Sequence, residues 1–438
     1  MNKRLMASVL VGTMSMSVLA GCSKAPDSNS DSKDSSAAVG TEYESKSDLT
    51  IEKKVSEISK EDAGKFRQGY LDFSLEMLKK NLEKEGKDKN VMISPASIML
   101  ALDMTASGAT GDTLAQIMNL YGGVDDPQGQ LSYAADLLKR MNETEGVKLH
   151  AADSIWINNK IMPDGLKSDY VDFVKKYFDA ELDSLAFDKA AQDRINNWVS
   201  EKTDKMIPSI VDDLDPSTAM MLINAITFDG KWSNQYKPSN VNDGIFRNAA
   251  GEEKNARLMR SKEDYYVEND KAEGFIKYYE GYQYAFVVML PKDKNQNAGD
   301  LISGFTGEEF DEYINSASSD YLLSGVLPQF NYDWSGSIVE QLKALGMEIP
   351  FDVDKADFSG IAGNGKDLYI NNVIHKTHIE VDENGTKAAA VTAVDVALGA
   401  AMIDDQQRKE VICDRPFAYA IVDTTDNTPV FIGTVNDI

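Results

Sequence analysis

Apolar residues recur at helical spacing in several parts of the chain. In 61–84 they return at every third or fourth position with charged residues between them, and 168–182 and 190–203 show the same periodicity. The stretch 90–108 predicts a short strand that runs into a helix, because Ser94 can cap the helix and the proline after it suits the first helical turn. These patterns predict helices in four parts of the first half of the chain.

Strand-like apolar runs dominate the second half. They cover 221–232, 284–291, 321–332, 368–382 and 417–423. They do not alternate regularly with helices, so a doubly wound parallel sheet is not expected. The pattern favours an α+β fold class, with mixed sheets and helices packed around them. No change of composition marks a linker after about residue 55, so 55–438 is predicted to form one continuous domain.

The N-terminus has the pattern of an export signal. Two basic residues precede an uncharged run over 5–20, which is shorter than a membrane-spanning helix requires. The run ends in "LAGC", which resembles a bacterial lipobox. We therefore expect 1–21 to be a lipoprotein signal peptide and Cys22 to carry the lipid. The alternative is an ordinary signal peptide in which the cysteine is incidental.

The segment after the signal is polar and rich in serine. Eight of the 26 residues in 23–48 are Ser, and such a composition cannot bury enough apolar surface to fold. We interpret 22–54 as a disordered tether. The expected location is outside a bacterial membrane, held there by the lipid, or extracellular if the protein is shed.

The charge of the chain limits its partners. Its 45 basic and 71 acidic residues give a net charge of −26, whereas nucleic acids and anionic membranes select basic surfaces. We expect no nucleic-acid partner, and membrane contact only through the lipid on Cys22. The other cysteine, Cys413, lies in a strand-like context and is predicted to be a buried thiol.

The sequence contains little that would support catalysis or metal binding. It has three histidines and lacks a G-x-S-x-G elbow, an H-E-x-x-H helix and a phosphate-binding Walker loop. His375 and His378 lie in an alternating strand pattern, so their side chains should point to opposite faces. We therefore expect no enzyme activity, no metal ion and no cofactor.

Residues 383–402 read "ENGTKAAAVTAVDVALGAAM", and half of them are Ala or Val. If 386–398 were extended, one face would carry only small or apolar side chains and would span about 43 Å at roughly 3.3 Å per residue. That composition suits a strand that enters a sheet. An Ala-rich surface helix is the alternative. The small-residue face comprises Thr386, Ala388, Ala390, Thr392, Val394, Val396 and Leu398.

Five motifs in the same order resemble the serpin family over about 60–438. They are "NVMISPASIMLALDMTASGATGDT", "INNWVSEKTDKMI", "LINAITFDGKW", "NVIHKTHIEVDENGTKAAAVTA" and "DRPFAYAIVDTTDNTPVFIGTV". The resemblance implies a serpin fold with three β-sheets, eight or nine helices and an exposed reactive-centre loop at about 383–410. It also implies a suicide-substrate mechanism, in which a serine protease cleaves the loop and the acyl-enzyme is trapped when the loop inserts into the main sheet. The inhibitor would act as a monomer and supply no catalytic group.

The resemblance also assigns the reactive bond. Counted from Glu383, the bond follows Gly399 and precedes Ala400, with Leu398 and Ala401 as alternates. Basic residues are absent from 388–407, so trypsin-like targets are not expected. Small and aliphatic residues suit the shallow pocket of elastase-like or subtilisin-like proteases.

Two further sets of residues follow from the resemblance. The hinge, where the loop begins to insert, comprises Glu383, Gly385, Thr386, Ala388, Ala389 and Ala390. The shutter and breach, where the main sheet opens, comprise Asn90, Ser94, Ser97, Asn224, Trp232 and His375. The resemblance implies that the polar members form a hydrogen-bonded cluster and that Trp232 packs where the loop first inserts.

Three rival interpretations remain open. The chain could be a non-inhibitory serpin that acts as a binding or chaperone module, or an inhibitor of cysteine proteases. A solute-binding surface lipoprotein would share the lipobox and the acidic body, but it would not need the small-residue hinge.

Overall fold

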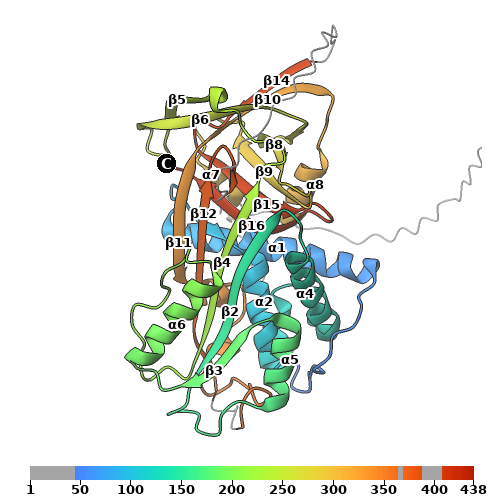
Figure 1. Cartoon of the computed structure of the whole chain (residues 1–438). Coiled ribbons are helices and arrows are strands. Elements are labelled where there is room, and N and C mark those ends of the chain that lie inside the picture. Colours follow the sequence, from blue (N-terminus) through green and yellow to red (C-terminus); the bar gives the residue numbers. More distant parts are fainter. Residues whose placement is uncertain (1–44, 364–367, 387–406) are drawn as a thin grey trace, which may run out of the picture. The chain divides into compact units, whose positions relative to one another are not determined.

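The computed structural model describes residues 45–363, 368–386 and 407–438 (Figure 1). Several predictions lie outside these residues. They are the signal peptide, the lipidated Cys22, the tether as far as residue 44, the hinge alanines Ala388, Ala389 and Ala390, and the reactive-bond residues Leu398, Gly399, Ala400 and Ala401. Within the described ranges, no helix is both long and apolar enough to cross a membrane.

The described residues form three β-sheets, the number that the serpin resemblance implies. The main sheet has six strands in the order β11-β12-β13-β4-β2-β3 and mixes parallel with antiparallel pairs. Its strands are β11 (Phe330–Ser337), β12 (Ile370–Val381), β13 (Gly385–Thr386), β4 (Met220–Lys231), β2 (Val147–Asn158) and β3 (Glu181–Leu185).

The other two sheets lie toward the opposite end of the body from α5 and β3 (Figure 1). The second sheet contains β1 (Met92–Ile93), β16 (Thr428–Val435), β15 (Phe417–Asp423), β9 (Tyr284–Pro291), β8 (Ala272–Tyr278) and β7 (Tyr265–Glu268). Every residue of β9, β15 and β16 is buried. Burial on both faces explains why β9 and β15 appear in the sequence as the apolar runs 284–291 and 417–423. The third sheet contains β14 (Gln407–Ile412), β10 (Tyr321–Pro328), β6 (Glu253–Glu263) and β5 (Val241–Arg247).

Nine α-helices occur within the described residues, as the eight or nine of the serpin resemblance anticipate. Helix α2 is buried along its whole length and packs against both the main sheet and β16. Ser94 caps it as predicted, because its side chain accepts a hydrogen bond from the Ser97 backbone N–H. The helices are α1 (Lys60–Glu85), α2 (Pro95–Ala106), α3 (Gly111–Asn119), α4 (Pro127–Asn142), α5 (Ser168–Phe178), α6 (Lys189–Lys202), α7 (Ala298–Ser303), α8 (Gly307–Asn315) and α9 (Val339–Ala344). The described ranges also contain two 3₁₀ turns, η1 (Pro238–Asn240) and η2 (Ile349–Phe351).

The predicted tether boundary at residue 54 needs correction. Residues 45–58, here called the N-terminal strap, lie against the folded body and belong to the same compact unit as the rest of 45–438. The Gly111 N–H donates to the Leu49 carbonyl at 2.8 Å, and Lys53 Nζ pairs with Asp169 Oδ2 at 2.5 Å. The folded body therefore begins by Ser45 rather than at residue 55.

Candidate functional site

The centre of the main sheet is a seam between two parallel strands. β12 pairs directly with β4, from Ile370 opposite Met220 to His378 opposite Thr227. Beyond that point the two strands separate, and β13 occupies the space between them. Thr386 pairs with Val381 of β12 on one side and with Gly230 of β4 on the other. The seam is therefore a fork that already contains the first two residues of an intervening strand.

A tight turn places β13 in the fork. The Asp382 side chain accepts hydrogen bonds from the backbone N–H groups of Asn384, at 2.7 Å, and Gly385, at 3.1 Å. A Cβ atom at Gly385 would lie 2.1 Å from the Gly230 carbonyl oxygen, which is closer than two such atoms can approach. Only glycine fits at this entry to the sheet.

Aromatic side chains enclose the entry point. Thr386 is fully buried, and its hydroxyl lies 2.7 Å from the Tyr279 hydroxyl. The Tyr279 ring stacks on Trp232 with 4.5 Å between ring centroids. Trp232 in turn donates from Nε1 to the Asp382 carbonyl at 2.9 Å. The structure thus places Trp232 beside the entry to the sheet, where the resemblance puts it.

The hinge residue Glu383 is held from two sides. Its carboxylate accepts a hydrogen bond from Gln329 Nε2 at 2.5 Å, and its carbonyl accepts one from the Tyr236 N–H at 3.0 Å. Gln329 lies in the short link between β10 and β11, so this contact ties the hinge to the far side of β12.

Below the fork, a buried polar cluster crosses the seam. The Ser94 N–H donates to His375 Nε2 at 3.0 Å, so His375 carries its proton on Nδ1, and that nitrogen donates to the Asn224 side-chain oxygen. His375 is on β12 and Asn224 is its direct partner on β4, so this hydrogen bond joins the two strands of the seam. Burial lowers the pKa of His375 to about 3, which keeps the ring neutral.

The cluster continues onto β2 through a residue that the sequence analysis missed. Asp153 accepts hydrogen bonds from Asn224 Nδ2 and, at 3.2 Å, from Ser97 Oγ. Burial raises the pKa of Asp153 to about 7, although both hydrogen bonds oppose the shift. The signal that could have revealed Asp153 is a carboxylate within the run 151–157, where every other residue is apolar or a serine.

The structure does not bring Asn90 into this cluster. Its side chain accepts from the Asn436 N–H at 2.6 Å and donates to the Asp437 carbonyl at 2.7 Å. Asn90 therefore anchors the C-terminal end of the chain, and the prediction that it belongs to the polar cluster is wrong. Ser94, Ser97, Asn224 and His375 are all present in it.

The second histidine of β12 and the cysteine near the C-terminus lie in structural surroundings. His375 and His378 face opposite sides of β12, as predicted, and His378 pairs with Asp333 at 2.6 Å. Cys413 is fully buried, which raises the pKa of its thiol well above the ordinary range. Among the described residues, no group of three or more His, Cys, Asp or Glu could hold a metal ion.

Three sheets, a forked parallel seam and a polar cluster that bridges the seam define an α+β protein. The family model described as serpin, serine protease inhibitor, matches residues 68–438. The chain belongs to the serpin family. Serpins are protease inhibitors rather than catalysts.

Relatives match along most of their own length. An uncharacterized serpin-like protein of Thermococcus kodakarensis is 31% identical over 359 residues, which cover 80% of this chain and 81% of that protein. The leukocyte elastase inhibitor of Bos taurus is 32% identical over 369 residues, covering 79% and 93%. The crystal structure of tengpin, a thermophilic serpin, in its native state superposes with a TM-score of 0.78 at 36% identity, covering 89% of this chain and 97% of tengpin.

Proposed function

We propose that this protein is a suicide-substrate inhibitor of serine endopeptidases, with residues 387–406 as the bait. The observation that carries the proposal is the position of β13: Gly385 and Thr386 already lie between β12 and β4 and lead directly into the small-residue stretch. Serpin loops are an established case of strand addition to a sheet.

The chemistry is performed by the protease. Its serine Oγ adds to the carbonyl carbon before the scissile bond, the peptide C–N bond breaks, and the protease histidine delivers the serine proton to the departing amine. The acyl-ester that remains links the protease to the chain N-terminal to the cut. For this chain to enter the sheet beyond Thr386, β12 and β4 must part and the hydrogen bond between His375 and Asn224 must break. The proposal is that insertion distorts the protease before water hydrolyses the ester.

The proposed targets are elastase-like or subtilisin-like proteases. The bond between Gly399 and Ala400, or a neighbouring one that involves Leu398 or Ala401, offers small and aliphatic side chains to the protease pocket. The similarity to a leukocyte elastase inhibitor supports this class.

The proposed setting follows from the sequence. Lipid on Cys22 would hold a monomeric inhibitor outside a bacterial membrane, with the segment up to residue 44 as the spacer. Metabolic labelling with a radioactive fatty acid tests this, because a Cys22→Ala variant should lose the label.

Incubation with pancreatic elastase, neutrophil elastase and subtilisin tests the inhibitory function. We expect a band of summed mass that survives boiling in detergent, because the acyl-ester is covalent. Mass spectrometry of the C-terminal fragment after denaturation identifies the cleaved bond. Cleavage without a complex would favour the non-inhibitory serpin, and a complex with papain but with none of these enzymes would favour a cysteine-protease inhibitor.

A further inference from the structure

A buried ion pair lies where the second and third sheets meet the end of β4. Lys277 is on β8 of the second sheet, and its Nζ lies 3.0 Å from Oε1 of Glu263, the last residue of β6 in the third sheet. The Ser261 hydroxyl donates to the same carboxylate. The two charged side chains are only 2% and 5% exposed. No step of the proposed inhibition uses either of them.

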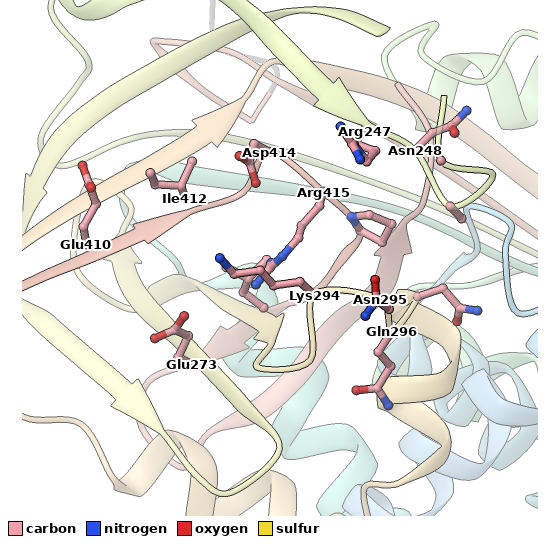
Figure 2. A pocket seen from close by; sticks show the side chains of 15 residues that line it. Arg247, Asn248, Glu273, Lys294, Asn295, Gln296, Glu410, Ile412, Asp414 and Arg415 are labelled. Atoms are coloured by element: carbon pink, nitrogen blue, oxygen red, sulfur yellow. The ribbon is translucent and has the colours of Figure 1, made fainter. Parts of the chain in front are cut away.

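Burial distinguishes this pair from an ion pair at the surface. Arg247, which lines the cavity of about 670 Å³ shown in Figure 2, pairs with Glu253 at 3.2 Å, but these two side chains are 65% and 61% exposed. Water screens an exposed pair, so it contributes little to stability. A buried pair loses the hydration of both charges, and the attraction between them roughly offsets that cost. The pair of Lys277 and Glu263 therefore adds little net stability, and what it supplies is a fixed position for the groups around it.

The cation of the buried pair faces two aromatic rings that follow β4 in the chain. Lys277 Nζ lies 4.2 Å from the centre of the Tyr236 ring and 5.6 Å from the centre of the Trp232 ring. Both distances are within the range of a cation–π attraction, which is stronger when the cation is removed from water. Both aromatic side chains are buried. The ion pair thus holds the two rings against the second and third sheets.

The same two aromatic residues hold the turn that precedes β13. The Trp232 N–H donates to the Asn384 carbonyl at 2.9 Å, and the Tyr236 N–H donates to the Glu383 carbonyl at 3.0 Å. Trp232 also donates from Nε1 to the Asp382 carbonyl at 2.9 Å. Three consecutive carbonyl groups of the turn are therefore bound by the two residues whose rings face the cation.

We propose that Lys277 is a positioning residue for the hinge. Its ion pair with Glu263 fixes the cation against the two rings, and the two aromatic residues fix the turn that presents Thr386 to the fork. Without the cation the turn would open more often, so Thr386 would be paired between β12 and β4 for less of the time. That Lys277 holds the turn follows from the contacts above. That a fixed turn favours insertion over release of the protease rests on the proposed function.

The variant that tests this role is Lys277→Met with Glu263→Leu. It removes both charges and replaces them with apolar side chains of similar size, a change that buried ion pairs often tolerate. A single substitution would leave one buried charge without a partner and would destabilise the whole fold. The matched control is Arg67→Met with Asp311→Leu, which removes a partly buried ion pair between α1 and α8.

The first test measures amide hydrogen exchange at Trp232 and Tyr236, whose N–H groups are bonded to the turn. We expect exchange at least about tenfold faster in the Lys277 variant than in the wild type and the control, because the turn opens locally. Unchanged exchange at both amides, or the same acceleration in the control, would overturn the proposal. Equal acceleration at every protected amide of the protein would also overturn it, because that result indicates a loss of global stability.

The second test counts the moles of inhibitor consumed per mole of the serine protease that forms the boiling-resistant complex. The Lys277 variant should need at least about threefold more inhibitor than the control, with cleaved inhibitor accumulating, whereas loop cleavage should be equally fast because the bait is unchanged. Equal consumption by the two variants would reject the effect on insertion. If the wild type forms no complex with any serine protease, the inhibitory function fails, and the exchange measurement alone decides whether Lys277 holds the turn.

Discussion

At the scale of single residues, the buried polar cluster below the fork contains a carboxyl group with a raised pKa. Asp153 is buried, and its pKa is raised from 3.8 to about 7. A carboxyl group whose pKa is higher in the folded than in the unfolded protein stabilises the fold when the pH is below the unfolded pKa. This stabilisation is lost as the pH rises from about 4 to about 7. Above pH 7 the folded protein must hold a buried charge.

Asp153→Asn should therefore stabilise the protein at neutral and alkaline pH. The expected gain is on the order of 2–4 kcal/mol at pH 8 and falls toward zero near pH 4. His375 acts in the opposite direction, since its pKa is lowered and its contribution is lost as the pH falls from about 6.5 toward 3. Both proteins contain His375, so the difference between their thermal midpoints, measured from pH 4 to 9 at one scan rate, isolates Asp153. Parallel midpoint curves would contradict the assignment.

Thr386 is the last residue of β13 and directly precedes the proposed bait. Thr386→Arg places a long charged side chain in the fully buried site beside Tyr279, so insertion should slow and the inhibitor should become a substrate. We expect cleavage by elastase with at least about tenfold less boiling-resistant complex. Glu380→Arg, on an exposed position of β12, is the control and should form the complex normally. An undiminished complex with Thr386→Arg would refute the prediction.

Individual site residues could be predicted from the sequence where they belong to one of the recognised motifs. Ser94, Ser97, Asn224 and His375 lie together because their motifs belong to α2, β4 and β12, which converge below the fork. Asn90 shares a motif with Ser94 but lies on the other side of β1, where its partners are Asn436 and Asp437, so the motif alone could not place it. Asp153 was missed because its environment depends on β2 lying against β4, a contact between segments far apart in the chain.

At the scale of elements, the sequence predicted strands best where both faces are buried. The bounds of β9 and β15 agree with the apolar runs 284–291 and 417–423. The run 321–332 instead forms parts of two strands in different sheets, because Pro328 has no N–H to continue the ladder and the chain turns at Gln329. The sequence analysis did not predict strands β2, β3, β5, β6, β7, β8 and β16 or helices α3, α4, α7, α8 and α9. The predicted helix 168–182 ends at Phe178, where Asp179 adopts a left-handed conformation.

The N-terminal strap should contribute to stability. Its partly buried Leu49 and Ile51 pack against the core, and Lys53 pairs with Asp169. A protein that begins at Val55 should lose about 1–3 kcal/mol relative to one that begins at Ser45, which corresponds to a thermal midpoint lower by a few degrees. Scanning calorimetry of the two truncated proteins measures this, and identical midpoints would show that the strap contacts are not stabilising.

At the scale of the whole molecule, inhibition requires that the cut form be more stable than the intact one. Limited proteolysis within 387–406, by an enzyme that is not trapped, should raise the thermal midpoint by more than about 10 °C, because the main sheet gains a strand in its centre. A shift of that size exceeds the few degrees that a change of about 1 kcal/mol produces. A non-inhibitory binding module would instead melt at the same temperature before and after cleavage.

The fork in the main sheet also bears on kinetics. Starting a new strand is normally the slow event, since chain entropy is lost before any pairing compensates for it. Here Thr386 is already paired on both sides, so that event takes place when the protein folds and not when a protease attacks. Under the proposed mechanism, only elongation would remain after cleavage, one residue at a time, and the pairs from His378 and Thr227 down to Ile370 and Met220 would release in turn. Separation of β12 from β4 would then take up almost all of the time available before the ester hydrolyses.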